Sequence, residues 1–466
     1  MAGGRLLIRG CDVVVTMDDD GIEIPGGSIL VEDGVIRWVG GGDPPEQMLP
    51  RSDDRGIDRT DGSGTVAIPG LVNTHHHMYQ AMTRAHAQEE SLFGWLVEQY
   101  PIWAGVDAAW ERTAARVALA ELALSGCTLT TDHHYVFPPG RPGLLEAEID
   151  AAGELGMRFH PCRGSMDLSE KDGGLPPDSV VQDTDTVLAE TEAAVKELHD
   201  PSPGSMLRIA VAPCSPFSVT DRLMRESVDL ARRLGVRLHT HIAETLDEEE
   251  HCVERFGRRP IDLLEDQGFV GDDVWLAHCV HMSDADVARL AATGTGAAWC
   301  PASNLRIGSG IARVRDMVAA AVRVGLGVDG SASNDTGHML GTARIGLLSA
   351  RAPRNGAMGD PGELTVRDVL RIATRGGAGC LGWDEEVGSL EVGKRADVAL
   401  VPVDGLSFAG AQRDLVAGVL LCAPPRVRHL FVEGRAVVRD GRLATADEDE
   451  IAAEGRRMGA RIAAGG

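Results

Sequence analysis

Histidine and carboxylate side chains recur in this 466-residue chain where short apolar segments end. His75 and His77 lie two positions apart just beyond such a segment, and residues i and i+2 of an extended strand face the same way. Two imidazoles on one face supply half of a metal site, although a merely polar strand end would look the same. His76 is expected to point in the opposite direction.

Three further apolar segments end on groups of the same kind. His241 closes one segment, and Glu244 follows in the next loop as a carboxylate that can carry protons without binding the metal. His239 shares the face of His241 and is expected to pack deeper. His278 closes the next segment, where an imidazole can hold an activated water or a developing oxyanion. Asp329 closes the last segment and either ligates a metal or caps the following helix.

Short apolar runs alternate with longer segments of helical periodicity from residue 65 onward. Most helical segments end at glycine, the usual C-cap. This alternation predicts a (β/α)₈ barrel, with an open doubly wound sheet as the alternative. The eight expected strands are 65–74, 128–134, 157–163, 207–213, 236–242, 274–279, 296–300 and 325–330.

The histidines and carboxylates described above then fall at the ends of strands one, five, six and eight. In a barrel these ends meet in one ring, so a single site explains all four signals. Three histidines and one aspartate suit Zn²⁺, with Fe²⁺ as the second choice. Such an ion lowers the pKa of a bound water to about 7 and so supplies a nucleophile at neutral pH. The pattern predicts a metal-dependent hydrolase.

Both ends of the chain have the pattern of short β-strands. We expect residues 1–66 and 386–445 to form one composite β-sandwich domain beside a catalytic barrel of residues 67–385. Residues 446–466 are expected to form a helical tail.

Four polar residues near the expected strand ends are candidates for substrate binding. Gln80, in the long connection 78–107, would bond the amide edge of a ring or lie in solvent. His133 ends the second strand. Arg163 ends the third strand and would read a carbonyl oxygen or pair with a loop carboxylate. Asn304 would contact substrate or brace the exit of the seventh strand.

The charge of the chain restricts its partners. The formal net charge of -25, from 45 basic and 70 acidic residues, disfavours nucleic acid and acidic membrane surfaces. Nine scattered cysteines without a CxxC pair, and no signal-peptide pattern at the start, predict reduced thiols in the cytoplasm. The sequence has no run of about 18 apolar residues, so no membrane span is predicted. A small molecule is therefore the expected partner.

Six motifs together resemble the single-metal deaminase branch of the amidohydrolase superfamily, over nearly the whole chain. They are PGLVNTHHH, HTHIAE, AHCVH, CPASNLRIGSG, GVDGSASND and GSLEVGKRADVALV. The resemblance implies a (β/α)₈ barrel with a β-sandwich built from both chain ends, which agrees with the pattern of elements. It also implies a homo-oligomer, dimeric or larger. The two-metal branch has a bridging lysine at a strand end, and we identify no lysine in this sequence that would have that role. The resemblance is therefore to the single-metal branch.

The resemblance also implies roles for individual residues. It makes His75, His77, His241 and Asp329 the metal ligands, with Asp329 also accepting a proton. Glu244 would deliver protons to the ring nitrogen and the leaving amine, and His278 would orient the attacking water.

Within the branch, TLTTDHHYVFPPG, HPCRGSM and GVDGSASNDTG are similar to 8-oxoguanine deaminases and triazine hydrolases. The expected activity is hydrolytic deamination of an amino-substituted nitrogen heterocycle, with 8-oxoguanine or a related purine as the first candidate. A triazine chlorohydrolase or N-alkylaminohydrolase is the alternative, and a non-catalytic metal-binding relative is a remote one.

Overall fold

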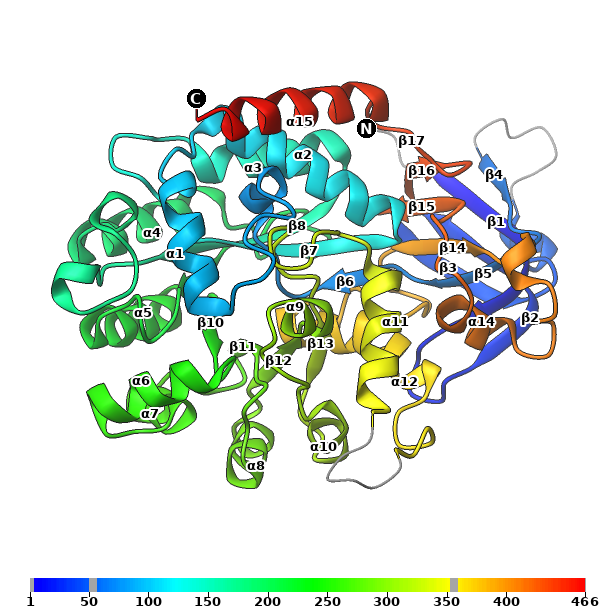
Figure 1. Ribbon diagram of the computed structural model, residues 1–466. Helices are drawn as coiled ribbons and strands as arrows, with labels where there is room; N and C mark the ends of the chain where they lie inside the picture. The colour runs from blue at the N-terminus through cyan, green and yellow to red at the C-terminus, as the bar shows by residue number, and fades with distance from the viewer. Residues whose placement is uncertain (1–3, 50–56, 353–358, 466) are drawn as a thin grey trace.

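Eight parallel strands close into a barrel, which confirms the predicted fold class (Figure 1). The computed structural model describes residues 4–49, 57–352 and 359–465. The barrel strands follow chain order, and the ring closes where Leu326 of the last strand pairs with Asn73 of the first. They are β6 (Leu71–Asn73), β7 (Cys127–His134), β8 (Arg158–Ser165), β9 (Ala210–Pro213), β10 (Leu238–Ile242), β11 (Val274–His278), β12 (Gly296–Trp299) and β13 (Val324–Leu326).

Helices surround the barrel on its outer side (Figure 1). The α-helices of this part of the chain are α1 (Leu92–Trp103), α2 (Ala108–Leu124), α3 (Leu144–Leu155), α4 (Thr184–Leu198), α5 (Asp221–Leu234), α6 (Leu246–Phe256), α7 (Pro260–Asp266), α8 (Asp284–Thr293), α9 (Pro301–Arg306), α10 (Val314–Ala319), α11 (Met339–Ala350), α12 (Val366–Arg371) and α13 (Gly377–Leu381). A π-helical turn, η5 (Ile372–Gly376), joins the last two. The short 3₁₀ helices are η1 (Glu46–Met48), η2 (Met78–Met82), η3 (Glu170–Asp172), η4 (Asp178–Val180) and η6 (Leu406–Phe408).

Helix α5 illustrates how local sequence sets these boundaries. The Thr220 side chain accepts a hydrogen bond from the backbone N–H of Leu223, which satisfies a donor that the first turn leaves free. Gly235 ends the helix at a φ of 69°, a left-handed conformation that glycine adopts without a steric cost. The expected glycine C-cap is thus present.

Strands from both ends of the chain form a second sheet beside the barrel (Figure 1). Its order is β17-β16-β15-β14-β5-β1-β2-β3, and β4 pairs with β1. Helix α14 (Leu415–Leu421) packs beside it, and the expected tail is helix α15 (Glu448–Ala463), which lies on α2. The strands are β1 (Arg5–Val15), β2 (Glu23–Glu32), β3 (Val35–Gly41), β4 (Ile57–Asp61), β5 (Thr65–Pro69), β14 (Val398–Pro402), β15 (His429–Val432), β16 (Arg435–Arg439) and β17 (Arg442–Leu443).

The segment 65–74 was expected to be a single barrel strand, and this is wrong. Its first half, β5, pairs with β14 and β1 in the second sheet, while its second half, β6, belongs to the barrel. The chain crosses between the sheets at Gly70, where an added Cβ would lie 2.1 Å from Thr128 Oγ1. An uninterrupted apolar run hides this crossing because both halves are buried. The exact domain boundaries stay predictions.

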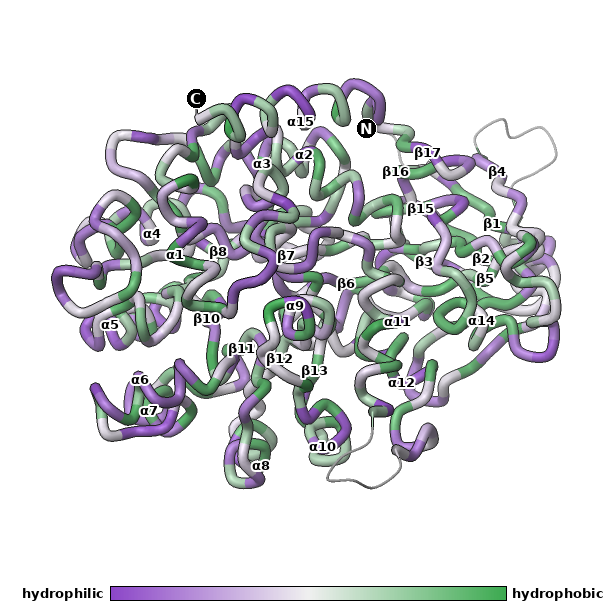
Figure 2. Tube along the Cα trace, viewed as in Figure 1, coloured by the Kyte–Doolittle hydropathy of each residue, from purple (hydrophilic) through white to green (hydrophobic). Residues whose placement is uncertain are grey.

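Apolar side chains fill both units, and Figure 2 shows hydrophobic segments running through the strands of the second sheet. Within the described residues, no helix is both long and apolar enough to span a membrane. All nine cysteines are unpaired, and eight of them are buried.

Candidate metal centre and active site

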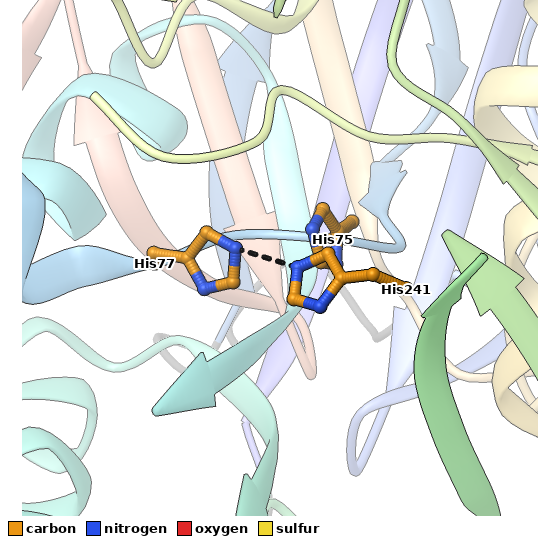
Figure 3. A group of neighbouring side chains, drawn as sticks. All are labelled: His75, His77 and His241. Atoms are coloured by element: carbon orange, nitrogen blue, oxygen red, sulfur yellow. Dashed lines mark hydrogen bonds between the residues drawn. The ribbon is translucent and has the colours of Figure 1, made fainter. Parts of the chain in front are cut away.

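Three imidazoles converge at the carboxyl-terminal end of the barrel. His75 and His77 follow β6, and His241 lies in β10 on the far side of the ring (Figure 3). The Nε2 atoms of His77 and His241 are 3.1 Å apart, and one nitrogen from each of the three rings lies within 4.8 Å of the others. Burial lowers the pKa of all three, to about 4 for His77 and His241, so each ring is neutral and can bind a metal.

Asp329 follows β13 and completes this group. Its Oδ1 lies 3.3 Å from His75 Nε2 and 3.4 Å from His77 Nε2. Ligands bound tetrahedrally to one Zn²⁺ at about 2.0–2.1 Å are separated by roughly 3.3–3.4 Å. His75 Nε2 is buried and has no hydrogen-bond partner. Three imidazole nitrogens and one carboxylate at these separations fit a zinc ion.

Backbone carbonyls orient two of these rings. His77 Nδ1 donates to the carbonyl of His133 at 2.7 Å, and His241 Nδ1 donates to the carbonyl of Cys214 at 2.8 Å. Because each Nδ1 carries the proton, each Nε2 presents its lone pair to the centre of the ring.

A second histidine orients the third ring. His239 Nδ1 donates to the carbonyl of Trp275 at 2.8 Å, which leaves its Nε2 as an acceptor. That nitrogen lies 2.8 Å from His75 Nδ1 and therefore accepts its proton. His239 is a buried, hydrogen-bonded residue, as expected, and it fixes the direction of the His75 lone pair.

Glu244 and His278 lie next to the carboxylate of Asp329. His278 Nε2 is 3.4 Å from Glu244 Oε2 and 4.0 Å from Asp329 Oδ2. The side-chain amide of Asn304 donates to His278 Nδ1 at 2.9 Å, so the proton of the neutral ring is on Nε2, directed between the two carboxylates. Burial, and then the charge of Asp329, raises the pKa of Glu244 well above its usual range. Glu244 thus holds a proton readily in this setting.

Two of these residues have unusual backbone conformations. His278 has a φ of 72° and Asp329 a φ of 64°, in the left-handed region that favours glycine. Such conformations persist where the surrounding structure fixes them, and they are frequent at functional sites. Both side chains line the pocket.

A pocket opens above the group, between the barrel and the helix α1. Gln80 lies in its wall, and neither its side-chain oxygen nor its nitrogen has a hydrogen-bond partner. The remaining wall is largely apolar and aromatic. The lining residues are His77, Gln80, Leu92, Trp95, Leu96, Tyr100, Tyr135, Cys214, Phe217, His241, Glu244, His278, Ile307, Asp329 and Ser333.

Three of the expected substrate-binding residues lie outside this lining. Arg163 donates to Glu190 at 2.6 Å and to Gln182 at 2.7 Å, and its guanidinium lies over the ring of Phe137. Arg163 thus pairs with a carboxylate, as one of the two expectations had it, but Glu190 belongs to helix α4 and not to a loop. Arg163 is therefore not directed at the pocket.

The other two contact the histidines instead. The ring of His133 donates from Nε2 to the carbonyl of Ala212 and stacks on His241, with ring centres 4.7 Å apart. Asn304 contacts His278 as described. Both residues contact histidines that line the pocket, but neither lines the pocket itself.

The sequence pattern did not point to several residues of the site. Ser309 lies 3.5 Å from Glu244 Oε1, and Cys214 and Phe217 line the pocket beyond β9. The segment that forms β9 was expected to be the fourth barrel strand. The position of Cys214 and Phe217 just after this strand was therefore the one signal that could have pointed to them. Cysteine and phenylalanine carry no distinctive chemistry that would have drawn attention to it.

Comparison with known proteins places this arrangement in a family. A match to the amidohydrolase family covers residues 66–437, most of the chain. The chain belongs to the amidohydrolase family.

Individual amidohydrolases resemble the chain over nearly its full length. The 8-oxoguanine deaminase of Pseudomonas aeruginosa is 44% identical, over 96% of this chain and 97% of that protein. The hydroxydechloroatrazine ethylaminohydrolase of a Pseudomonas species is 40% identical, over 96% and 93%. The solved structure of an atrazine chlorohydrolase from Arthrobacter aurescens, complexed with zinc, superposes with a TM-score of 0.90 at 34% identity, over 97% of this chain and 100% of that one.

Proposed function

We propose that this amidohydrolase is a zinc-dependent aminohydrolase that releases ammonia from an amino-substituted nitrogen heterocycle. The observation that carries the proposal is the arrangement of His75, His77, His241 and Asp329 around one point, with Glu244 and His278 beside it in the same pocket. A merely metal-binding relative would need the first group but not the second.

His75, His77, His241 and Asp329 would hold the metal. A bound zinc ion would supply a water of lowered pKa and a Lewis acid that stabilises negative charge on the attacking oxygen. Asp329 has a second oxygen, Oδ2, that faces His278 and is placed to accept a proton from the attacking water. It would therefore act as a base as well as a ligand.

Glu244 and His278 would act on the substrate from the other side of the pocket. Glu244, which holds its proton readily, protonates the ring nitrogen beside the reacting carbon and makes that carbon more electrophilic. His278 presents an N–H from Nε2 to the oxygen that becomes negatively charged. Glu244 would next take the hydroxyl proton of the adduct and deliver it to the departing nitrogen, so that ammonia leaves and the ring carbonyl forms. The proton held by Asp329 would then return Glu244 to its starting state.

Gln80 is the residue placed to recognise the ring. Its amide has one acceptor and two donors that are buried and unpartnered, a costly state unless a ligand pairs with them. The edge of an oxopurine offers an N–H and a carbonyl side by side, which matches both ends of a carboxamide. Trp95 and Tyr100 provide a flat apolar wall for such a ring.

The first candidate substrate is 8-oxoguanine or a related oxopurine, because the deaminase that resembles this chain at 44% identity is named for it. A triazine is the second candidate. It is favoured by the ethylaminohydrolase at 40% identity and by the close structural match to a chlorohydrolase. A cytoplasmic location and a homo-oligomeric state stay predictions.

The test is product release by zinc-loaded protein. We would measure ammonia from 8-oxoguanine, guanine, isoxanthopterin, cytosine and amino-triazines, and chloride or alkylamine from substituted triazines. Ammonia from an oxopurine at a kcat/KM far above that for every triazine is expected. Release of chloride or alkylamine with no ammonia from any purine would overturn the deaminase proposal and favour a triazine hydrolase.

A further inference from the structure

A second group of ionisable side chains lies buried behind the candidate metal ligands. Asp132 and His134 project from the same face of β7, toward Glu111 of α2 and Glu148 of α3. All four are fully buried, and none lines the pocket. Four ionisable groups without solvent are costly unless they neutralise one another.

Protons bound within the group can reduce its net charge. Burial alone would lower the pKa of His134, but the charge and hydrogen bond of Glu111 outweigh burial and raise it. His134 Nδ1 lies 3.4 Å from Glu111 Oε2, and its Nε2 donates to the carbonyl of Val136. Burial, followed by the charge of the neighbouring Asp132, raises the pKa of Glu148 well above its usual range, so Glu148 keeps a proton that it can share with Asp132.

Asp132 in turn belongs to a set of three hydrogen bonds that join the end of β7 to the histidine segment after β6. The His133 N–H donates to the carbonyl of His76 at 2.7 Å, and His77 Nδ1 donates to the carbonyl of His133 at 2.7 Å. The Met78 N–H donates to Asp132 Oδ1 at 2.6 Å. We call these three bonds the β7 clasp.

The third bond of the clasp controls the turn after the ligand. Met78 begins the 3₁₀ helix η2, and His77 is its N-cap residue without a side-chain capping bond of its own. Asp132 therefore satisfies a donor that the turn would otherwise bury unpaired. Without this bond, the backbone on the carboxyl side of His77 can rotate and carry the imidazole with it.

We propose that Asp132 is a positioning residue for the metal site, held by Glu148 from behind and fixing through Met78 the direction of the His77 ring. The inference rests on the proposed assignment of His77 as a metal ligand. The cluster does not need a cation of its own, although Glu111, His134 and Glu148 are close enough together to hold one. The clasp connects it directly to a ligand, whereas none of its members lines the pocket that opens on the candidate metal ligands.

The test is zinc affinity, measured by competition with a chromogenic chelator. Asp132→Ala is expected to weaken zinc binding by about 10- to 100-fold, the usual effect of removing a group that orients a ligand. Asp132→Asn keeps an acceptor oxygen for Met78, so its affinity is expected within about threefold of wild type. The visible absorption of the cobalt-substituted Asp132→Ala protein is expected to shift, because the His77 ring changes its orientation.

Asp397→Ala is the matched control, since Asp397 is an equally buried carboxylate far from the ligands, bound to Arg158. It is expected to lower the unfolding temperature without changing zinc affinity. If Asp132→Ala behaves like this control, the role is only structural and the proposal fails. If Asp132→Ala does not fold, Glu148→Ala against Glu148→Gln gives the same comparison, with weaker zinc binding expected only for the alanine variant.

Two further outcomes separate the alternatives. His241→Ala is expected to lose zinc, and if it binds zinc like wild type, the assignment of the ligands is wrong, whatever Asp132 does. Metal analysis of the wild-type protein is expected to give one ion per chain. Two ions per chain, with one lost in Glu148→Gln, would overturn the positioning role and make the cluster itself a cation site.

Discussion

At the scale of single residues, the same side chain has different roles according to what its second nitrogen contacts. His241 directs Nε2 to the candidate metal because its Nδ1–H donates a hydrogen bond to a carbonyl. His278 has the opposite arrangement, because Asn304 donates to its Nδ1 and leaves the proton on Nε2. The first is therefore suited to bind a cation and the second to stabilise an anion.

Glu244→Gln tests the role of the proton carrier. Glutamine has nearly the same shape but cannot transfer a proton, so kcat is expected to fall by about 10²- to 10⁴-fold while zinc content stays at the wild-type value. Steady-state kinetics on the best substrate, together with metal analysis, would check this. Full turnover by the zinc-loaded Glu244→Gln protein would remove Glu244 from the mechanism.

At the scale of elements, the turn after β13 leaves room for Gln80, the candidate substrate-recognition residue. An added Cβ at Gly330, after β13, would lie 1.8 Å from Oε1 of Gln80 in η2. The absence of a side chain at Gly330 therefore allows the Gln80 amide to occupy its present position at the pocket wall.

Gly330→Ala is expected to displace the Gln80 amide and raise KM by about five- to tenfold, the cost of one lost hydrogen bond, with a smaller change in kcat. Gln80→Ala is expected to raise KM similarly. Because both changes remove the same contact, the double variant should be no worse than Gln80→Ala alone. Additive increases in KM would mean that Gly330 acts elsewhere.

Helix α6 sets the loop that carries Glu244. Glu248, near the start of α6, accepts hydrogen bonds from the backbone N–H groups of Ala243 and Glu244 at 2.9 and 2.8 Å. Burial nevertheless raises the pKa of Glu248 to about 7. The carboxyl group therefore binds its proton more tightly in the folded protein than in the unfolded chain.

It follows that Glu248 contributes less to stability as pH rises. The contribution is fully present below the unfolded pKa of about 4.5 and is lost as pH rises through the folded pKa of about 7. The unfolding temperature of wild type relative to Glu248→Gln is expected to fall between about pH 4.5 and 7. Glu250→Gln, an exposed change on the same helix, should give no such trend, and a flat difference for Glu248→Gln would contradict the prediction.

At the scale of the whole molecule, a buried ion network joins the barrel to the second sheet. Arg158 begins β8, and its Nη2 lies 3.2 Å from Asp397 Oδ1 and also pairs with Glu433. Arg395 pairs with Glu433 as well. These residues lie at the amino-terminal ends of the barrel strands, opposite the candidate active site, so they serve the assembly of the two sheets.

Arg158→Met is expected to lower the free energy of unfolding by about 3–5 kcal/mol, because it leaves the buried carboxylate of Asp397 without its cation and removes one of the two cations that pair with Glu433. KM and zinc affinity are expected to stay unchanged, since the site is at the other end of the barrel. Denaturant unfolding and steady-state kinetics would check both parts. A large rise in KM would show that the two ends of the barrel are coupled.

The sequence determined the parts of this protein that depend on periodicity and residue type. Alternating apolar runs and helical segments predicted the barrel, because burial of a parallel strand requires a continuous apolar run and a helix to cover it. The ends of strands one, five, six and eight predicted that His75, His77, His241, Glu244, His278 and Asp329 would gather, since a closed barrel brings those ends into one ring.

Only the tertiary structure decided what the remaining polar residues contact. Arg163 ends a barrel strand as His241 does, yet Glu190 and Phe137 hold it away from the pocket. The crossing at Gly70 and the clasp made by Asp132 were equally hidden, because a buried strand reads the same whichever sheet it joins. Such contacts form between residues distant in sequence, and no local pattern encodes which of several possible partners a side chain contacts.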